Sequence, residues 1–213
     1  MALRAKLTAV ATSTVLAACS VVGVRGTEEP RHQVVDRIGT VEIRQYGPRV
    51  AAETAVPGDE LAARSAGFRR LAAYIFGANR ARSAIAMTAP VAQERPETIA
   101  MTAPVAQNRD DTGQWVIRFY MPAQYTLQTV PQPLDPSVRL VAVPGETVAV
   151  LRFSGSIGPE AVAARQRELL AALQGAAWRP DGSVAAWFYD PPWTLPPFRR
   201  NEVAVPVAPA DRR

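Results

Sequence analysis

Histidine and cysteine, the residue types on which most nucleophile–base pairs and many metal sites depend, are rare in this chain. The sequence contains one cysteine, Cys19, and one histidine, His32, and both precede the part of the chain that we expect to fold. A cysteine–histidine pair, a serine–histidine–aspartate triad and a metal site with histidine or cysteine ligands are therefore excluded for the folded part. From these counts we expect a protein that is not an enzyme.

Carboxylates are the remaining candidates for catalysis. Glu202 and Asp190 lie near Tyr189 in the sequence, and a pocket that excludes water from either carboxyl group would let it act as a base. A salt bridge from Glu202 to Arg199 or Arg200 is the simpler role for this carboxylate. Both roles stay open on the sequence alone.

A nine-residue repeat stands out among the elements that must position these groups. The sequence IAMTAPVAQ occurs at residues 85–93 and again, letter for letter, at residues 99–107. Apolar residues fall at alternate positions in both copies, which is typical of a β-strand with one buried side. The short polar segment between the copies predicts a hairpin, lengthened by a local duplication.

Two segments have the three- and four-residue apolar spacing of helices. The first begins near Gly58 and Asp59 and ends at Gly77, and the second begins at Pro159 and ends at Gly175. One face of each helix is expected to be buried. On the first helix this face consists of Leu61, Ser65, Phe68, Leu71, Ala72 and Ile75. On the second helix it consists of Val162, Gln166, Leu169, Leu170 and Leu173.

Strand-like alternation surrounds both helices and repeats in the same order in each half of the chain. Each half reads as strand, helix and two further strands, without obvious identity between the halves. The pattern predicts one α+β domain in which two helices flank antiparallel sheet, with a pseudo-two-fold repeat of strand, helix, strand, strand.

The N-terminus has the features of an export signal. Arg4 and Lys6 precede an uncharged, moderately apolar run at residues 7–18, which is too short to span a bilayer as a helix. The run ends in Leu16, Ala17, Ala18 and Cys19, which resembles a bacterial lipobox. The resemblance implies a signal peptide at residues 1–18 and lipidation of Cys19. An ordinary secretory signal with an incidental cysteine is the alternative.

The lipobox resemblance also implies the arrangement of the mature chain. Ser20 follows the cysteine, which in the usual sorting pattern favours the outer membrane. We therefore expect an exported protein on the periplasmic side of the envelope, anchored to the membrane by acyl chains. Residues 19–33 would form a tether, residues 34–207 the folded domain, and residues 208–213 a disordered tail.

The charge of the chain does not indicate nucleic-acid binding. The formal net charge is +5, but nearly all basic residues are arginines, and Lys6 is the only lysine. The arginines are scattered, and no basic stripe with interleaved aromatic residues is present.

Long motifs in the folded part resemble the SOUL family of heme-binding proteins. The resemblance extends over roughly residues 34–207. The motifs that carry it occur in order and are VEIRQYGP at 41–48, GFRRLAAYIFGAN at 67–79, IAMTAPV twice, LDP at 134–136, VAVLRFSG at 148–155 and YDPPWTLPPFRRNEV at 189–203. It implies a distorted antiparallel β-barrel, or two sheets of about four strands, each with a helix alongside, and a fold related to gyrase-inhibitor-like domains.

The same resemblance implies a non-covalently bound heme or related tetrapyrrole. A porphyrin is a flat apolar disc with two propionates, so its site needs an apolar wall and cations at one edge. The family's pocket walls, carried over, are Ser65, Phe68, Ala72 and Ile75 on the first helix, with Tyr189, Pro191, Pro192 and Trp193 opposite. Arg199 and Arg200 would meet the propionates.

The sequence departs from the family where one branch has a proposed axial histidine. Gln45 occupies that position here, and it is a poor ligand for iron. Met87 and Met101 can ligate iron, but in alternating strands they are more often core residues. We therefore expect binding through the ring, without a histidine ligand.

Three functions remain in competition. The first is a monomeric, non-catalytic tetrapyrrole carrier or buffer anchored at the envelope. The second is a hydrolase-like enzyme that acts on small hydrophobic molecules through a buried carboxylate, as some relatives of the gyrase-inhibitor-like fold do. The third is an envelope scaffold whose ancestral pocket is filled by its own side chains.

Overall fold

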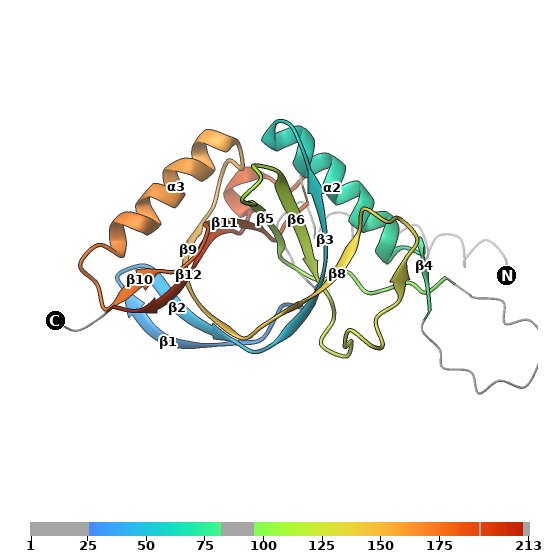
Figure 1. The fold of residues 1–213 in the computed structure, drawn as a ribbon. Helices are drawn as coiled ribbons and strands as arrows, with labels where there is room; N and C mark the ends of the chain where they lie inside the picture. Colours follow the sequence, from blue (N-terminus) through green and yellow to red (C-terminus); the bar gives the residue numbers. More distant parts are fainter. Residues whose placement is uncertain (1–25, 82–95, 192, 211–213) are drawn as a thin grey trace, which may run out of the picture.

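The computed structural model describes residues 26–81, 96–191 and 193–210. The predicted signal peptide, Cys19 and the first copy of the repeat lie outside these residues. In the described residues the chain folds as an α+β protein with a large antiparallel sheet and two helices (Figure 1).

Ten strands form the large sheet. They are β1 (His32–Ile38), β2 (Val41–Tyr46), β3 (Arg49–Val56), β5 (Val105–Arg109), β6 (Trp115–Tyr120), β8 (Arg139–Val143), β9 (Glu146–Phe153), β10 (Trp178–Pro180), β11 (Ala185–Phe188) and β12 (Asn201–Pro209). A separate two-stranded sheet pairs β4 (Asn79–Arg80) with β7 (Gln132–Pro133).

The single sheet corrects the expectation of a barrel or of two sheets of about four strands. The strands are hydrogen-bonded in the order β1-β2-β9-β12-β11-β5-β6-β3-β8, with β10 on β12, and the sheet is not closed. Pairing of β11 with β5 joins the strands β1-β2-β9-β12-β11 to the strands β5-β6-β3-β8 in one sheet. Because β5 and β11 are far apart in the sequence, alternation alone does not reveal this pairing.

The expected repeat of elements is visible in the sheet order. The strands that flank the β11–β5 pair are β12, β9 and β2 on one side and β6, β3 and β8 on the other. Counted outward from the β11–β5 pair, β12 thus corresponds to β6, β9 to β3 and β2 to β8. The chain bends at Gly47 and Pro48 between β2 and β3, and at Pro144 and Gly145 between β8 and β9.

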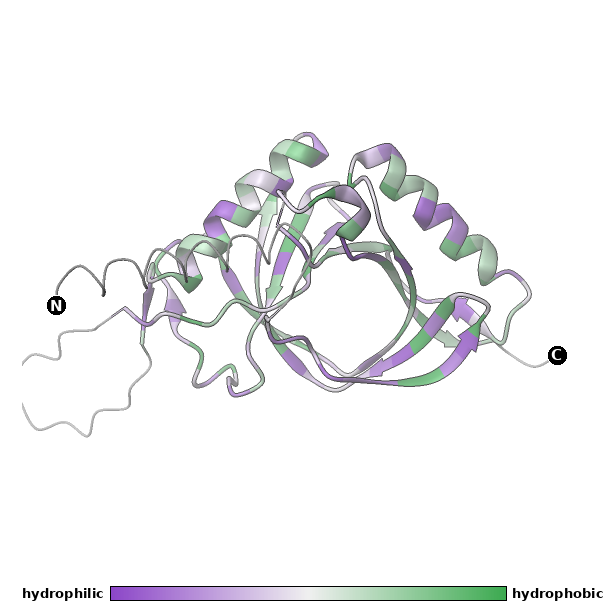
Figure 2. Ribbon diagram, turned by 180° about the vertical axis from the view of Figure 1, so that it is seen from behind, coloured by the Kyte–Doolittle hydropathy of each residue, from purple (hydrophilic) through white to green (hydrophobic). Residues whose placement is uncertain are grey.

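Both helices lie on the same face of the curved sheet, α2 (Glu60–Ile75) against β3 and β6, and α3 (Pro159–Ala172) against β9 and β12 (Figure 1). Asp59 caps α2, since its carboxylate accepts hydrogen bonds from the backbone N–H groups of Leu61 and Ala62. Pro159 occupies the first turn of α3, as the sequence predicts. Polar and apolar residues alternate along both helices (Figure 2).

The buried face of α2 is rotated from the predicted one. Ala63, Gly67, Leu71, Tyr74 and Ile75 are buried, whereas Leu61, Ser65 and Phe68 are exposed. The reason is that Gly67 lets the helix approach β6 closely. A Cβ atom added at Gly67 would lie 2.7 Å from Ile117 Cγ1. On α3 the predicted residues Val162, Leu169 and Leu173 are buried, but Leu170 is exposed.

The second copy of the repeat forms a strand only from Val105 onward, and this strand, β5, pairs with β6 and β11. Residues 96–104 are not in a strand, so the predicted alternation does not hold there. Ile99 is nonetheless buried against α2, and its backbone N–H donates to the carbonyl of Ile75.

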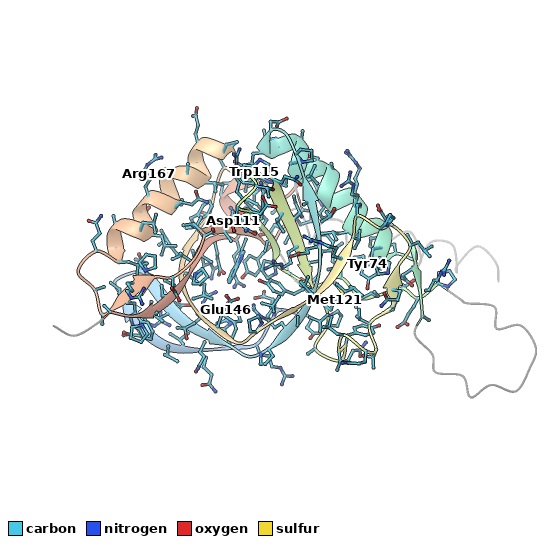
Figure 3. The ribbon with its side chains drawn as sticks, viewed as in Figure 1. Tyr74, Asp111, Trp115, Met121, Glu146 and Arg167 are labelled. Carbon is cyan, nitrogen blue, oxygen red and sulfur yellow. The ribbon has the colours of Figure 1, made fainter. Side chains whose placement is uncertain are left out.

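The other face of the sheet is concave and forms a separate interior. Its apolar cluster includes Tyr46, Tyr120, Val148, Trp187 and Tyr189. Side chains fill the space that the ribbon appears to leave open in Figure 1, as Figure 3 shows, with Glu146 labelled among them. This interior contains the charged groups that matter for the candidate site.

Candidate ligand-binding site

A buried carboxylate, Glu202 on β12, lies at the centre of the concave interior and is fully paired. Arg44 on β2 donates to both carboxylate oxygens at 2.9 and 3.2 Å, and Arg200 donates to Oε1 at 3.0 and 3.1 Å. The hydroxyl of Tyr189 donates to Oε2 at 2.7 Å. The salt bridge to Arg200 confirms the simpler of the two roles predicted for Glu202.

The charges around Glu202 keep this group ionised. Burial by itself raises the pKa of Glu202, but the hydrogen bonds and charges of Arg44 and Arg200 outweigh burial and lower the pKa below its ordinary value. Burial and the neighbouring carboxylate raise the pKa of the Tyr189 hydroxyl. A carboxylate with a lowered pKa and two cationic partners is a weak base for proton abstraction.

Arg49, the first residue of β3, lies between two tyrosine rings. Its guanidinium carbon is 4.5 Å from the ring centroids of both Tyr46 and Tyr120. Nη2 of Arg49 forms an ion pair with Glu146. The side chain is only 9% exposed, and its Nε and Nη1 donate to no group of the described residues. An unpaired buried donor costs about 1–3 kcal/mol.

Residues 27–31 directly precede β1 and are called the strap below. The carbonyl of Glu28 accepts a hydrogen bond from the N–H of Ala103 at 2.9 Å, and the side chain of Glu28 accepts one from the N–H of Ala123 at 2.9 Å. Both oxygens of Glu29 accept from Nη1 of Arg200, at 2.9 and 3.0 Å. The strap is thus held at three points, although we had expected this part of the chain to belong to a tether.

Two cavities adjoin the strap. An enclosed cavity of about 10 Å³, here called the inner cavity, is lined by Glu29, Pro30, His32, Tyr46, Arg49, Pro104, Tyr120, Trp187 and Tyr189. A groove of about 660 Å³, here called the strap groove, opens on the other side of the strap. Glu29, Pro30, Arg49 and Tyr120 line both, so these residues separate the two cavities.

The strap groove has an apolar wall with cations beside it. Apolar residues of three segments line it, namely Pro48, Val50, Met121, Pro122, Ala123, Leu127, Ala142, Val143 and Pro144. Two arginines, Arg31 and Arg49, line it as well, together with the strap carboxylates Glu28 and Glu29. Its volume falls within the range of about 300–1,000 Å³ that is usual for small-molecule sites. A second hollow of about 660 Å³, beside β1, is lined mostly by polar residues such as Gln45 and Glu146.

The residue types in the strap groove fit a tetrapyrrole. A flat apolar ring requires an extensive apolar surface, and its propionates require cations, which Arg31 and Arg49 provide. Met121 and Tyr125 belong to residue types that ligate heme iron. The Tyr125 hydroxyl donates to Glu97 at 2.6 Å, and burial together with Glu97 raises its pKa, which disfavours the phenolate. His32 is exposed, and its ring contacts Tyr46.

The structure brings together only part of the predicted site. Tyr189 and Arg200 meet at Glu202, and the Arg200 guanidinium stacks on the Tyr189 ring at 3.9 Å. On α2, Ser65 and Phe68 are exposed, Ala72 is half-buried and Ile75 is 1% exposed within the core.

The remaining predicted residues lie in the loop before β12. Trp193 is 63% exposed, and Nε of Arg199 donates to the carbonyl of Thr194. Pro191 is half-buried, and Pro192 lies outside the described residues. None of the cavities described above is lined by the predicted α2 residues or by Trp193.

The sequence analysis missed Arg49 and the strap. The motif VEIRQYGP ends one residue before Arg49, and the bend at Gly47 and Pro48 turns this arginine toward the tyrosines. Nothing in the spacing of Glu28 and Glu29 indicates that Glu28 contacts Ala103 and Ala123, or that Glu29 contacts Arg200. The signal that was present is local: two acidic residues directly before the first strand.

Within the described residues, no group of three or more histidine, cysteine, aspartate or glutamate side chains is arranged to hold a metal ion. Of the helices in this same part of the chain, none is long and apolar enough to cross a membrane.

Comparisons with known proteins give a family and a fold. A family model described as SOUL heme-binding protein matches residues 27–206. No curated protein matches the chain. The match begins in the strap, which the structure also joins to the folded part.

Solved structures resemble the fold at low sequence identity. A cryo-EM structure of an EcmrR–DNA complex matches with a TM-score of 0.58 and 9% identity, over 80% of this chain and 57% of that one. The EcmrR C-terminal domain matches with a TM-score of 0.54 and 10% identity, over 84% of this chain and 99% of that domain. This chain thus spans little more than half of the first protein, and the likeness at these identities shows the fold alone.

Proposed function

Because the chain belongs to the SOUL heme-binding protein family, we propose that it binds heme or a related tetrapyrrole and carries or buffers it without catalysing a reaction. The observation that carries the proposal is the strap groove of about 660 Å³, with an apolar wall and two arginines. The family makes heme a possible ligand, and the groove has the size and residue types that such a ligand requires.

The residues of the strap groove offer two kinds of contact to a tetrapyrrole, apolar contact with the ring and ion pairs with the propionates. Pro48, Val50 and Leu127 provide apolar surface for the ring, and burial of ring area supplies most of the binding free energy. Arg31 and Arg49 donate hydrogen bonds to the propionates and form ion pairs with them. When heme is the cargo, Met121 in the groove wall is of a residue type that could ligate its iron.

The paired state of Glu202 favours a carrier over the alternative of a hydrolase-like enzyme. An enzyme of that kind needs a carboxylate whose pKa is raised so that it can accept a proton near neutral pH. The pKa of Glu202 is lowered, because Arg44 and Arg200 outweigh burial. The scaffold alternative is favoured by the small inner cavity, but the strap groove beside it is open.

The cellular location is part of the proposal and rests on the sequence. Arg4, Lys6 and the run that ends at Cys19 support export and lipidation. We propose a monomer held at the periplasmic side of the envelope, in the outer membrane, with a tetrapyrrole as its small-molecule partner.

A heme titration followed by the Soret band tests the proposed function. The full chain should bind hemin saturably at one site. Ala142→Trp places a large side chain in the groove at an exposed position of β8 and should weaken binding at least tenfold, by roughly 1.4 kcal/mol. Ala73→Trp, at an exposed position of α2, is the matched control and should bind like the wild type.

The family-derived site on α2 makes a different prediction in the same titration. If the ring lies against Phe68 and Trp193, then Phe68→Ala and Trp193→Ala weaken binding and Ala142→Trp does not. Absence of saturable binding to the wild type contradicts the proposed function altogether.

A further inference from the structure

The strap places a carboxylate of the protein itself where a ligand's carboxylate would bind. Glu29 accepts both of its hydrogen bonds from Nη1 of Arg200, and its side chain is 31% exposed. The other two guanidinium nitrogens of Arg200, Nε and Nη2, donate to Glu202. Nη1 is therefore the donor that becomes free when Glu29 moves away.

A second arginine already has free donors on the same side of the molecule. Arg49 is fixed between Tyr46 and Tyr120, and Glu146 engages only its Nη2. Its Nε and Nη1 are buried without a partner in the described residues. Arg49 lines both the inner cavity and the strap groove, so its guanidinium lies at the boundary that Glu29 and Pro30 close.

The walls beneath the strap are aromatic. Tyr46, Tyr120, Trp187 and Tyr189 line the inner cavity, and the Tyr46 and Trp187 rings pack edge to face at 5.9 Å. The inner cavity, with about 10 Å³, accommodates no more than about one water molecule while the strap is in place. Glu29 and Pro30 are two of the four residues that line both cavities, so moving them would remove the part of the dividing wall that the strap provides.

We infer that the strap is an internal competitor, and that a planar ligand with a carboxylate binds by displacing Glu29 from Arg200 and reaching the inner cavity beside Arg49. The tetrapyrrole as ligand rests on the proposed function, whereas the strap itself does not. Few hydrogen bonds hold the strap, and the one from the Ala123 N–H is exposed, so local opening requires little disruption of the fold.

Glu29→Gln tests the inference, with Glu28→Gln as the matched control. Glutamine at position 29 loses the charge that pairs with Arg200. Glutamine at position 28 also loses a charge beside the groove, but its side-chain oxygen still accepts from the Ala123 N–H. Glu29→Gln should bind protoporphyrin IX tighter on the order of tenfold, and Glu28→Gln should stay within about twofold of the wild type.

The dimethyl ester of protoporphyrin IX shows whether tighter binding depends on the ligand's carboxylates or only on easier opening of the strap. The ester has the same ring but cannot pair with Arg200, so Glu29→Gln should not tighten its binding. When the porphyrin binds the wild type, three results would each overturn the inference: equal tightening of acid and ester, tightening by Glu28→Gln as large as by Glu29→Gln, or no change in Glu29→Gln.

Two further measurements distinguish failure of the inference from failure of the proposed function. Hydrogen exchange of the Ala103 amide, which donates to the Glu28 carbonyl, should be faster in Glu29→Gln without ligand.

Pyrenebutyrate, a flat carboxylate that is not a tetrapyrrole, should bind tighter to Glu29→Gln, whereas pyrenebutanol should not. If both results hold and neither porphyrin binds, the proposed function fails and the inference stands. Unchanged exchange, or unchanged pyrenebutyrate binding, overturns the inference.

Discussion

Replacing Glu202 by glutamine should destabilise the fold strongly. The side chain is 0% exposed and accepts hydrogen bonds from Arg44, Arg200 and Tyr189. Breaking a buried ion pair by removing one partner costs about 3–5 kcal/mol, because the remaining charge stays buried. Arg44 keeps Glu42 and Arg200 keeps Glu29, so the low end of this range, about 3 kcal/mol, applies.

Urea unfolding followed by circular dichroism at pH 7 measures this effect. The free energy of unfolding should fall by about 3 kcal/mol with an unchanged m-value, and the Tm should fall by roughly 6–12 °C for a domain of this size. Glu168→Gln is the control, since Glu168 pairs with Arg165 on the exposed side of α3 and should cost under about 1 kcal/mol. A loss below about 1 kcal/mol in Glu202→Gln would refute the reasoning.

The pH dependence of the same variant gives an independent check. The pKa of Glu202 is lower in the folded state than its ordinary value of 4.5. The stabilisation from its charge is therefore complete above about pH 4.5 and is lost as the pH falls through the folded-state pKa. The difference between the wild type and Glu202→Gln should shrink below pH 4.5, and a constant difference down to pH 3 would contradict the assignment.

Three further predictions concern the helices and the N-terminus. Gly67→Ala should destabilise the protein by about 1–3 kcal/mol in urea unfolding, because the new Cβ overlaps Ile117, and the cost should be smaller in an Ile117→Ala background. Asp59→Ala should cost about 1 kcal/mol by loss of the α2 cap, whereas Asp59→Asn should stay near the wild type, and equal effects would contradict capping. The intact mass of the chain from a bacterial host should correspond to an acylated form that starts at Cys19, and an unmodified form that starts at Met1 would refute export.

The sequence predicted elements better than it predicted their assembly. Both helices begin where their capping and proline signals indicate, and the order of elements repeats between the halves as expected. The rotation of α2 was missed because it depends on Gly67 packing against Ile117, a long-range contact. The single sheet was missed for the same reason, since it depends on the long-range pairing of β11 with β5.

In the candidate site, too, contacts between residues close in the sequence were predictable, whereas contacts between distant segments were not. The pairing of Glu202 with Arg200 was predictable, because alternation along β12 puts both at one end of a strand near Tyr189. Arg49 and the strap were not predictable. An arginine between two tyrosines, and a carboxylate that folds back onto Arg200, arise from contacts between distant segments that have no local periodicity.

A crystal structure of the full chain with protoporphyrin IX tests the central claim most directly. Electron density for the macrocycle is expected in the strap groove, against Pro48, Val50 and Leu127, with a propionate at Arg49. Density against Phe68 and Trp193 on the α2 side, with the strap groove empty, would contradict it.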